Sequence, residues 1–332
     1  MDIEKLIAAY PSMTDIHLTE DQPVTIRVYG ELKVLKEYPQ ETWFDEFFHS
    51  YLSEDKKKQF AQEGACDSSF SVGAIRCRLH LYQSGGKKVG AIRILPELSS
   101  VCDDPDQGWM DKIAHLDHGL VLITGPSGSG KSTTMARILQ QISEKRALHV
   151  ITLEDPIEYV IPSGKSLVHQ REIGNDVSDF PRGIREALRE DPDVIAVGEM
   201  RDAETIGAAL TAAETGHLVL GTLHTTSAKD AVGRIIHGFS MDREREIRQL
   251  LSTNLYGIAA QKLYRSGKNT FLLREILTNV AAISHLIREG KEEQIPSYME
   301  MGLHHMRTMK QAAYGLKGIS ERERDKLLKT LW

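Results

Sequence analysis

The sequence lacks several features that would point to particular classes of protein. None of its apolar stretches reaches the eighteen or so residues that a membrane-spanning helix needs. It holds three cysteines, Cys66, Cys77 and Cys102, and no C-x-x-C pair. Neither a disulfide framework nor a cysteine zinc site is therefore expected. We expect the three thiols to be reduced and structural.

An excess of positive charge is missing as well. With 41 Lys and Arg residues against 47 Asp and Glu residues, the formal net charge is −6, which gives no general attraction to nucleic acid. Residues 1–10 carry two acids and only a short apolar stretch, unlike a cleavable signal peptide, so a cytosolic location is expected. The chain shows no tandem repeat and no low-complexity segment.

The length of 332 residues favours two domains. Residues 1–100 have a mixed α/β pattern, in which the segments 25–30 and 74–81 alternate like half-buried antiparallel strands. A polar, turn-rich linker is predicted at residues 101–108. The second domain is predicted to begin at residue 109.

Residues 109–240 are predicted to form a P-loop NTPase core. Helical segments separate four apolar runs, which predicts a mostly parallel sheet covered on both faces. These runs are residues 120–124, 150–153, 194–197 and 218–223. From about Met241 to residue 332 the chain is expected to be helical, because Leu250, Leu251, Leu255 and Ile258 follow a helical spacing.

One segment predicts a phosphate site. It reads Gly-Pro-Ser-Gly-Ser-Gly-Lys-Ser from Gly125 to Ser132 and lies between a strand-like and a helix-like run, as in a P-loop. Backbone N–H groups of such a loop and of the following helix surround phosphate oxygens. Lys131 is expected to reach the β- and γ-phosphates of ATP, and the Ser132 hydroxyl to ligate Mg²⁺. The predicted ATP-binding residues are Gly125, Ser127, Gly128, Ser129, Gly130, Lys131, Ser132 and Thr133.

Two acidic segments follow predicted strands of the same sheet. Glu154, Asp155 and Glu158 come after the strand that follows the P-loop helix, where a carboxylate can position or deprotonate an attacking water. Glu199 ends the apolar run 194–197 and resembles a Walker B acid, with Glu in place of the usual Asp. It is expected to hold Mg²⁺ through water. The alternative is that Glu199 caps the next helix, which begins near Ala203.

Histidines and arginines give further candidates. His217 and His224 bracket another apolar strand, where they could contact phosphate or bridge to a neighbouring subunit; which residue has which role stays open. Arg76, Arg78 and Arg93 lie on strands of the first domain. They are either exposed strand charges or arginines that neutralise transition-state charge from outside the core.

Taken together, these segments resemble the hexameric secretion ATPases, and within them the type IV pilus retraction (PilT-like) ATPases. The similarity covers nearly the whole chain. The matching segments are residues 15–18, 26–30, 93–96, 125–132, 154–158 (the Asp box), 187–193, 198–202 and 213–228 (which includes the His box).

The resemblance implies an N-terminal PAS-like α/β domain followed by a RecA-like P-loop NTPase domain with a helical C-terminal subdomain. It implies a homohexamer that hydrolyses ATP with Mg²⁺ and drives an inner-membrane platform protein of the pilus machinery from the cytoplasmic face. Glu158 would act as catalytic base, Glu199 would bind Mg²⁺, and His217 would lie near the γ-phosphate. The catalytic residues that it implies are Glu158, Glu199, His217, Arg76, Arg78 and Arg93.

Within the family, retraction is favoured because the chain is short and lacks a tetracysteine zinc element. The retraction motif usually reads Ala-Ile-Arg-Asn-Leu-Ile-Arg-Glu, and residues 282–289 match it except at Ser284 and His285. The alternatives are an ATPase for assembly of pili or pseudopili, including type II secretion and DNA uptake, a nucleic-acid translocase, and a regulatory partner that binds nucleotide without turnover.

Overall fold

The computed structural model describes residues 3–39, 41–73, 75–95, 97–98, 104–266 and 269–331. The chain divides into two compact units. The first unit comprises Met1–Cys102, Glu154–Val160 and Gln170–Asp179, and the second comprises Asp103–Leu153, Ile161–His169 and Phe180–Trp332. Residues 101–103 of the predicted linker, including Cys102, lie outside the described residues.

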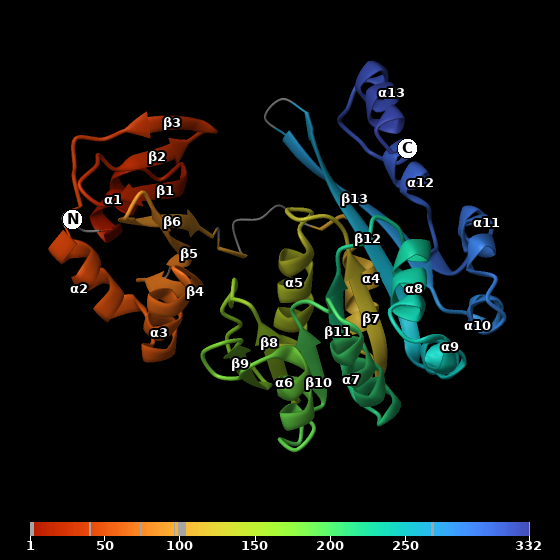
Figure 1. Ribbon diagram of the computed structural model, residues 1–332. Coiled ribbons are helices and arrows are strands. Elements are labelled where there is room, and N and C mark those ends of the chain that lie inside the picture. Colours follow the sequence, from red (N-terminus) through yellow and green to blue (C-terminus); the bar gives the residue numbers. More distant parts are fainter. Residues whose placement is uncertain are drawn as a thin grey trace. The chain divides into compact units, whose positions relative to one another are not determined.

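The first unit contains a six-stranded antiparallel sheet with the order β3-β2-β1-β6-β5-β4 (Figure 1). Its strands are β1 (Met13–Thr19), β2 (Thr25–Val28), β3 (Glu31–Val34), β4 (Ala65–Val72), β5 (Ile75–Ser84) and β6 (Lys87–Ile94). Its helices are α1 (Ile3–Ala9), α2 (Glu41–Tyr51) and α3 (Glu54–Glu63). Strands β2 and β5 confirm the two alternating segments, although residue 74 lies outside the described part.

Local signals explain the ends of α3, and the alternation of the strands explains the core of this unit. Ser53 caps α3 by accepting a hydrogen bond from the backbone N–H of Lys56, and Gly64 ends the helix in the left-handed region at φ 71°. Cys66 and Cys77 face the core, where burial raises the pKa of each thiol to about 11. Their burial agrees with the structural role expected for them.

The second unit contains a seven-stranded sheet with the order β13-β12-β7-β11-β10-β8-β9. Its strands are β7 (Gly119–Thr124), β8 (His149–Glu154), β9 (Leu167–Glu172), β10 (Val194–Val197), β11 (Leu218–Leu223), β12 (Leu255–Ser266) and β13 (Asn269–Thr278). From β12 to β8 neighbouring strands are parallel, whereas β13 is antiparallel to β12. Both β7 and β11 are buried along their whole length, which is why they occur as uninterrupted apolar runs. The expected fold class is confirmed.

Helices accompany this sheet. They are α4 (Gln107–Ala114), α5 (Lys131–Lys145), α6 (Phe180–Ala187), α7 (Ala203–Glu214), α8 (Ala228–His237), α9 (Met241–Asn254), α10 (Ala281–Arg288), α11 (Ile295–Glu300), α12 (Met309–Tyr314) and α13 (Glu321–Lys329), with short 3-10 helices η2 (Glu292–Gln294) and η3 (Leu303–His305). Helix α4 packs against α5, α6 against α7, and α8 against α9. Across the described ranges, none of the helices has the length and apolarity needed to cross a bilayer.

The expectation of continuous helix from Met241 onward is wrong for residues 255–278. Helix α9 ends at Asn254, and Leu255 and Ile258 lie on β12, which pairs with β7. Residues 257–261 are buried without interruption, and such a run does not distinguish a strand from a helix by its period. Figure 1 draws the β12–β13 hairpin in blue, and α12 and α13 pack against it.

Candidate functional site

The P-loop connects β7 to α5 and depends on its glycines. Gly125, Gly128 and Gly130 have φ angles of 149°, 74° and 88°, in the left-handed region that side chains rarely adopt. A Cβ atom on Gly125 would lie 2.4 Å from the backbone oxygen of Gln261 and 2.5 Å from Ser129 Oγ. Any other residue at position 125 would therefore displace the loop from β12.

The polar groups of this loop suit a phosphate ligand. Lys131 is nearly buried, and its Nζ donates to the backbone oxygens of Gly125 at 2.8 Å and Pro126 at 3.1 Å. Ser129 Oγ is buried and has no hydrogen-bond partner in the described part of the chain. The loop also leads into the N-terminus of α5, a helix of 15 residues, where unpaired backbone N–H groups favour an anion.

Glu199 lies just beyond the C-terminal end of β10. Its Oε2 is 2.7 Å from Arg201 Nη2, and its Oε1 is 2.9 Å from His224 Nε2. Burial alone would raise the pKa of this carboxyl, but the hydrogen bond and charge of Arg201 and the charges of His224 and Lys131 together lower it. Glu199 is thus an ionised acid on the side of the sheet where the P-loop lies.

The alternative reading of Glu199 as a helix cap is wrong. Helix α7 is capped by Asp202, whose Oδ1 accepts a hydrogen bond from the backbone N–H of Thr205 at 2.8 Å. The carboxylate of Glu199 is therefore not used to end the helix, and its oxygens face Arg201 and His224.

The two histidines lie at opposite ends of β11. Leu223 pairs with Thr124, so His224 follows the strand at the P-loop end, whereas Leu218 pairs with Gly119 at the far end. His217 precedes Leu218, and its Nδ1 lies 3.0 Å from the backbone oxygen of Ala212. At ~3.3 Å per residue, the six residues of β11 separate the histidines by roughly 20 Å. The expectation that His217 lies near the γ-phosphate is thus wrong for the P-loop of its own chain.

Within the first unit, Arg78 approaches Glu158 of the Asp box. Arg78 Nη1 is 3.9 Å from Glu158 Oε1, and its Nη2 is 3.7 Å from Asp67 Oδ1. The three side chains are each 28% to 42% exposed, so these are weak ion pairs. The Glu158 carboxylate therefore stays free to exchange its partner for water.

Arg76 holds the backbone next to Glu158. Its Nε donates to the backbone oxygen of Ile157 at 3.0 Å, while the Ile157 N–H donates to Glu172 Oε2 at 3.2 Å. Arg76 Nη2 and Glu172 Oε2 are themselves 3.5 Å apart, and both side chains are largely buried. An Arg–Glu pair thus binds both peptide groups of Ile157, the residue before Glu158. Sequence reasoning missed Glu172, because an acid on an edge strand carries no signal of its own.

Arg93 has a different environment. It is 68% exposed, and its Nε donates to Asp15 Oδ1 at 3.0 Å on the neighbouring strand β1. Arg76 thus donates a hydrogen bond to the backbone of the Asp-box loop of its own chain. The side chains of Arg78 and Arg93 are more exposed to solvent.

Helix α10 carries the retraction-like motif. Ile283, Leu286 and Ile287 are buried, which confirms a core stripe at helical spacing. Ser284 Oγ donates to the backbone oxygen of Ser252 at 2.9 Å and lies 3.0 Å from Asn279 Oδ1. The serine that replaces the usual arginine thus binds the end of α9.

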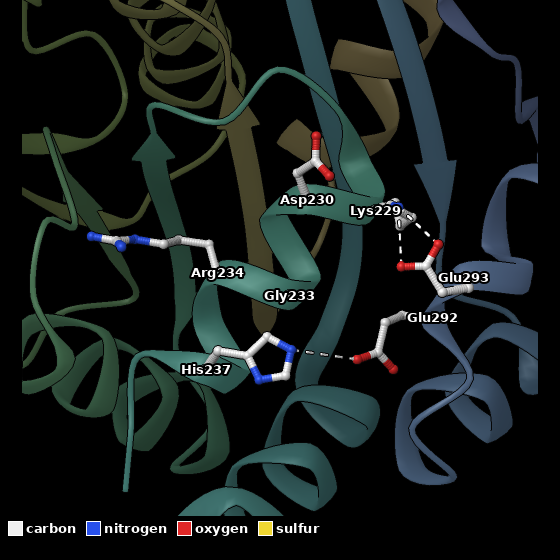
Figure 2. A pocket seen from close by; sticks show the side chains of 7 residues that line it. All are labelled: Lys229, Asp230, Gly233, Arg234, His237, Glu292 and Glu293. Carbon is white, nitrogen blue, oxygen red and sulfur yellow. Dashed lines mark hydrogen bonds and ion pairs between the residues drawn. The ribbon is translucent and has the colours of Figure 1, made fainter.

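A polar pocket of about 360 Å³ lies between α8 and η2 (Figure 2). Lys229 Nζ is 2.9 Å from Glu293 Oε2, and His237 Nε2 is 4.0 Å from Glu292 Oε1. Figure 2 shows Arg234 extending away from both acids; its Nη2 donates to the backbone oxygen of Arg201 at 3.2 Å. Because Lys229 and His237 already face Glu293 and Glu292, and Arg234 donates elsewhere, this pocket is a poorer phosphate site than the P-loop.

A P-loop between a buried strand and a helix, with an ionised acid at the end of another parallel strand of the same sheet, defines a P-loop ATPase. Comparison with known proteins gives the family. Residues 93–321 match the family model described as type II/IV secretion system protein. The chain belongs to this family.

Three relatives are similar over almost the whole chain. The type IV pilus retraction ATPase PilT of Pseudomonas aeruginosa is 39% identical, over 97% of this chain and 96% of the relative. A crystal structure of the pilus retraction motor PilT with bound ADP has a TM-score of 0.86 at 40% identity, covering 98% of this chain and 96% of that one. The ATPase DotB of Legionella pneumophila has a TM-score of 0.83 at 28% identity, covering 100% and 96%.

Proposed function

We propose that this chain is an ATP-hydrolysing motor that powers the retraction of type IV pili. The observation that carries the proposal is a complete P-loop beside the ionised Glu199, in a chain that aligns end to end with relatives named for pilus retraction. The ADP in the similar PilT structure supports nucleotide as the ligand. The assembly alternative has less support, because the names of these relatives specify retraction.

Nucleotide binding rests on the P-loop. Its backbone N–H groups and Lys131 would bind the phosphates, with Lys131 exchanging the carbonyls of Gly125 and Pro126 for phosphate oxygens. Ser132 and Glu199 would hold Mg²⁺, which supplies charge neutralisation on the phosphates when it is bound. A hydroxyl and a carboxylate fit this ion, because Mg²⁺ usually takes few protein ligands beside water and phosphate.

Turnover would depend on Glu158 as general base. Its carboxylate is partly exposed and only weakly paired with Arg78, so it is able to accept a proton from an attacking water. Arg76 and Glu172 would act as positioning residues, since they bind both peptide groups of Ile157 and thereby restrict the backbone on which Glu158 is carried.

The motor is proposed to be a homohexamer that acts on an inner-membrane platform protein of the pilus machinery, at the cytoplasmic face of the membrane. Of the three candidate arginines, Arg78 and Arg93 have the more exposed side chains, which supports a role in contacting a neighbouring subunit's nucleotide. His217, far from the P-loop of its own chain, is proposed to act at a subunit boundary.

Glu158→Gln tests the proposed base. Glutamine keeps the shape but does not accept the proton, so steady-state ATP hydrolysis should fall to background while ATP binding and assembly are retained. The matched control is Asp67→Asn, which removes the other acid partner of Arg78 and should keep near-normal turnover. Near-normal hydrolysis by Glu158→Gln would contradict the assignment of the base.

A count of surface pili on cells that carry Glu158→Gln then tests the direction of the motor. More pili with lost twitching motility would support retraction, whereas bald cells would indicate an assembly motor. Unchanged piliation would favour the regulatory alternative, and ATPase activity stimulated by DNA or RNA would favour a translocase.

A further inference from the structure

We propose that Gln261 is a positioning residue of the nucleotide site, and that Arg274 sets the orientation of its side-chain amide. The proposal rests on the assignment of the P-loop as the nucleotide site and extends it to a strand that supplies no residue of the nucleotide motifs. Gln261 lies on β12 and Arg274 on the antiparallel strand β13, where the two residues pair directly.

Gln261 packs against the P-loop. Its side chain is almost fully buried, and its Nε2 donates to the backbone oxygen of Ser129 at 3.1 Å. The same Nε2 lies 3.6 Å from where a Cβ atom on Gly130 would be, and the Gln261 backbone oxygen excludes a Cβ atom on Gly125. The P-loop therefore lies directly against Gln261.

Arg274 determines which end of the Gln261 side-chain amide faces the P-loop. The Oε1 atom of Gln261 is 3.4 Å from Arg274 Nε and 3.3 Å from Arg274 Nη2. A guanidinium group has donors only, so the amide has to present its oxygen to Arg274 and its NH₂ group to Ser129. The flipped amide would place donor against donor and oxygen against oxygen.

Arg274 is itself immobilised. It is fully buried, and its Nη1 and Nη2 donate to Asp104 at 2.6 and 2.8 Å. Nη1 also donates to Asp106 at 3.0 Å, and Nη2 to Thr134 Oγ1 on α5 at 2.9 Å. Burial would raise the pKa of the Asp104 carboxyl, but the hydrogen bonds and charge of Arg274 lower it. Removing Arg274 would leave buried charges unpaired, so Gln261 is the better residue to change.

The contact with Ser129 has a direct consequence for phosphate binding. The Ser129 carbonyl and the Gly130 N–H belong to one planar trans peptide group, in which the two bonds point in opposite directions. Since the carbonyl points to Gln261, the Gly130 N–H points away from it. Gln261 thus prevents this peptide from turning and keeps one N–H donor of the P-loop available to an anion.

Two variants separate this role from packing. Gln261→Glu keeps an acceptor for Arg274 but loses the donor to Ser129, and Gln261→Met is of similar size and has neither group.

The full-length chain is titrated with ADP and Mg²⁺ by calorimetry, its melting temperature is measured without nucleotide, and its ATPase kinetics are recorded. For both variants we expect about fivefold weaker ADP binding and a similar rise in KM. We expect kcat within about twofold, since the affected N–H binds the phosphate equally in the ground state and the transition state. For Gln261→Glu we expect a lower melting temperature than for the wild type, because its buried carboxylate faces the Ser129 carbonyl oxygen.

The matched control is Thr134→Val, which removes one hydrogen bond of Arg274 and leaves Gln261 in contact with Ser129. It should bind ADP like the wild type. The proposal is overturned if both Gln261 variants bind ADP like the wild type, or if Thr134→Val weakens binding equally. If Gln261→Glu does not fold, ADP binding by Gln261→Met alone tests the proposal. A Lys131→Ala variant that binds ADP like the wild type would instead refute the P-loop assignment itself.

Discussion

The two units of this protein place their functional groups by different means. In the second unit, the P-loop and Glu199 follow strands that are buried along their whole length, and the proposed phosphate donors are largely backbone N–H groups. In the first unit, Arg76 and Glu172 bind the Ile157 backbone through side-chain hydrogen bonds. If the proposed site is correct, we expect changes in the second unit to impair nucleotide binding and changes in the first unit to impair turnover.

Lys131→Ala should have the largest effect and tests the second unit. It removes a charged donor at the P-loop, and we expect turnover to fall by ~10²–10³-fold with a matching loss of nucleotide affinity. Steady-state ATPase assays and ADP calorimetry measure both quantities. Lys145→Ala, on the same helix but paired with Asp111 at the surface, is the control and should behave like the wild type. Unchanged nucleotide affinity in Lys131→Ala would contradict the expectation that the second unit governs nucleotide binding.

Glu172→Gln should have an intermediate effect and tests the first unit. The change keeps the shape of the side chain but removes the charge that faces Arg76, so the Ile157 backbone is held less firmly. We expect kcat to fall roughly tenfold, with ADP affinity unchanged. Glu63→Gln, at the exposed end of α3, is the control. A loss of ADP affinity without a loss of kcat would show that this part of the first unit contributes to nucleotide binding and not to turnover.

Ser69→Ala should have the smallest effect and sharpens the same comparison. Ser69 Oγ donates to Glu172 Oε2, but Glu172 would keep its bonds with Ile157 and Asn175. We expect a fall in kcat of about two- to threefold, measured at saturating ATP. Ser50→Ala, which removes a bond within α2 only, controls for the loss of a surface hydroxyl. A fall as large as that of Glu172→Gln would mean that Ser69 contributes more than its hydrogen bonds with Glu172 and Arg76 suggest.

The sequence predicted the strands of the parallel sheet well and the β12–β13 hairpin poorly. Runs such as residues 120–124 lie between turn-forming residues and are short, so they predict strands. The segment from Leu255 instead follows a helix without an intervening glycine or proline, and its small apolar residues fit either structure. Because that hairpin was missed, Gln261 and Arg274 were missed as candidates.

By itself, the sequence determined the P-loop, the acid at Glu199 and the buried strands β7, β8, β10 and β11, because these depend on local spacing and on backbone conformation near each residue. Only the tertiary structure decided that His217 lies far from the P-loop of its own chain, that Arg76 binds the Asp-box backbone, and that Gln261 supports Ser129. Those contacts join residues far apart in the chain, and sheet pairing and burial, not local spacing, bring them together.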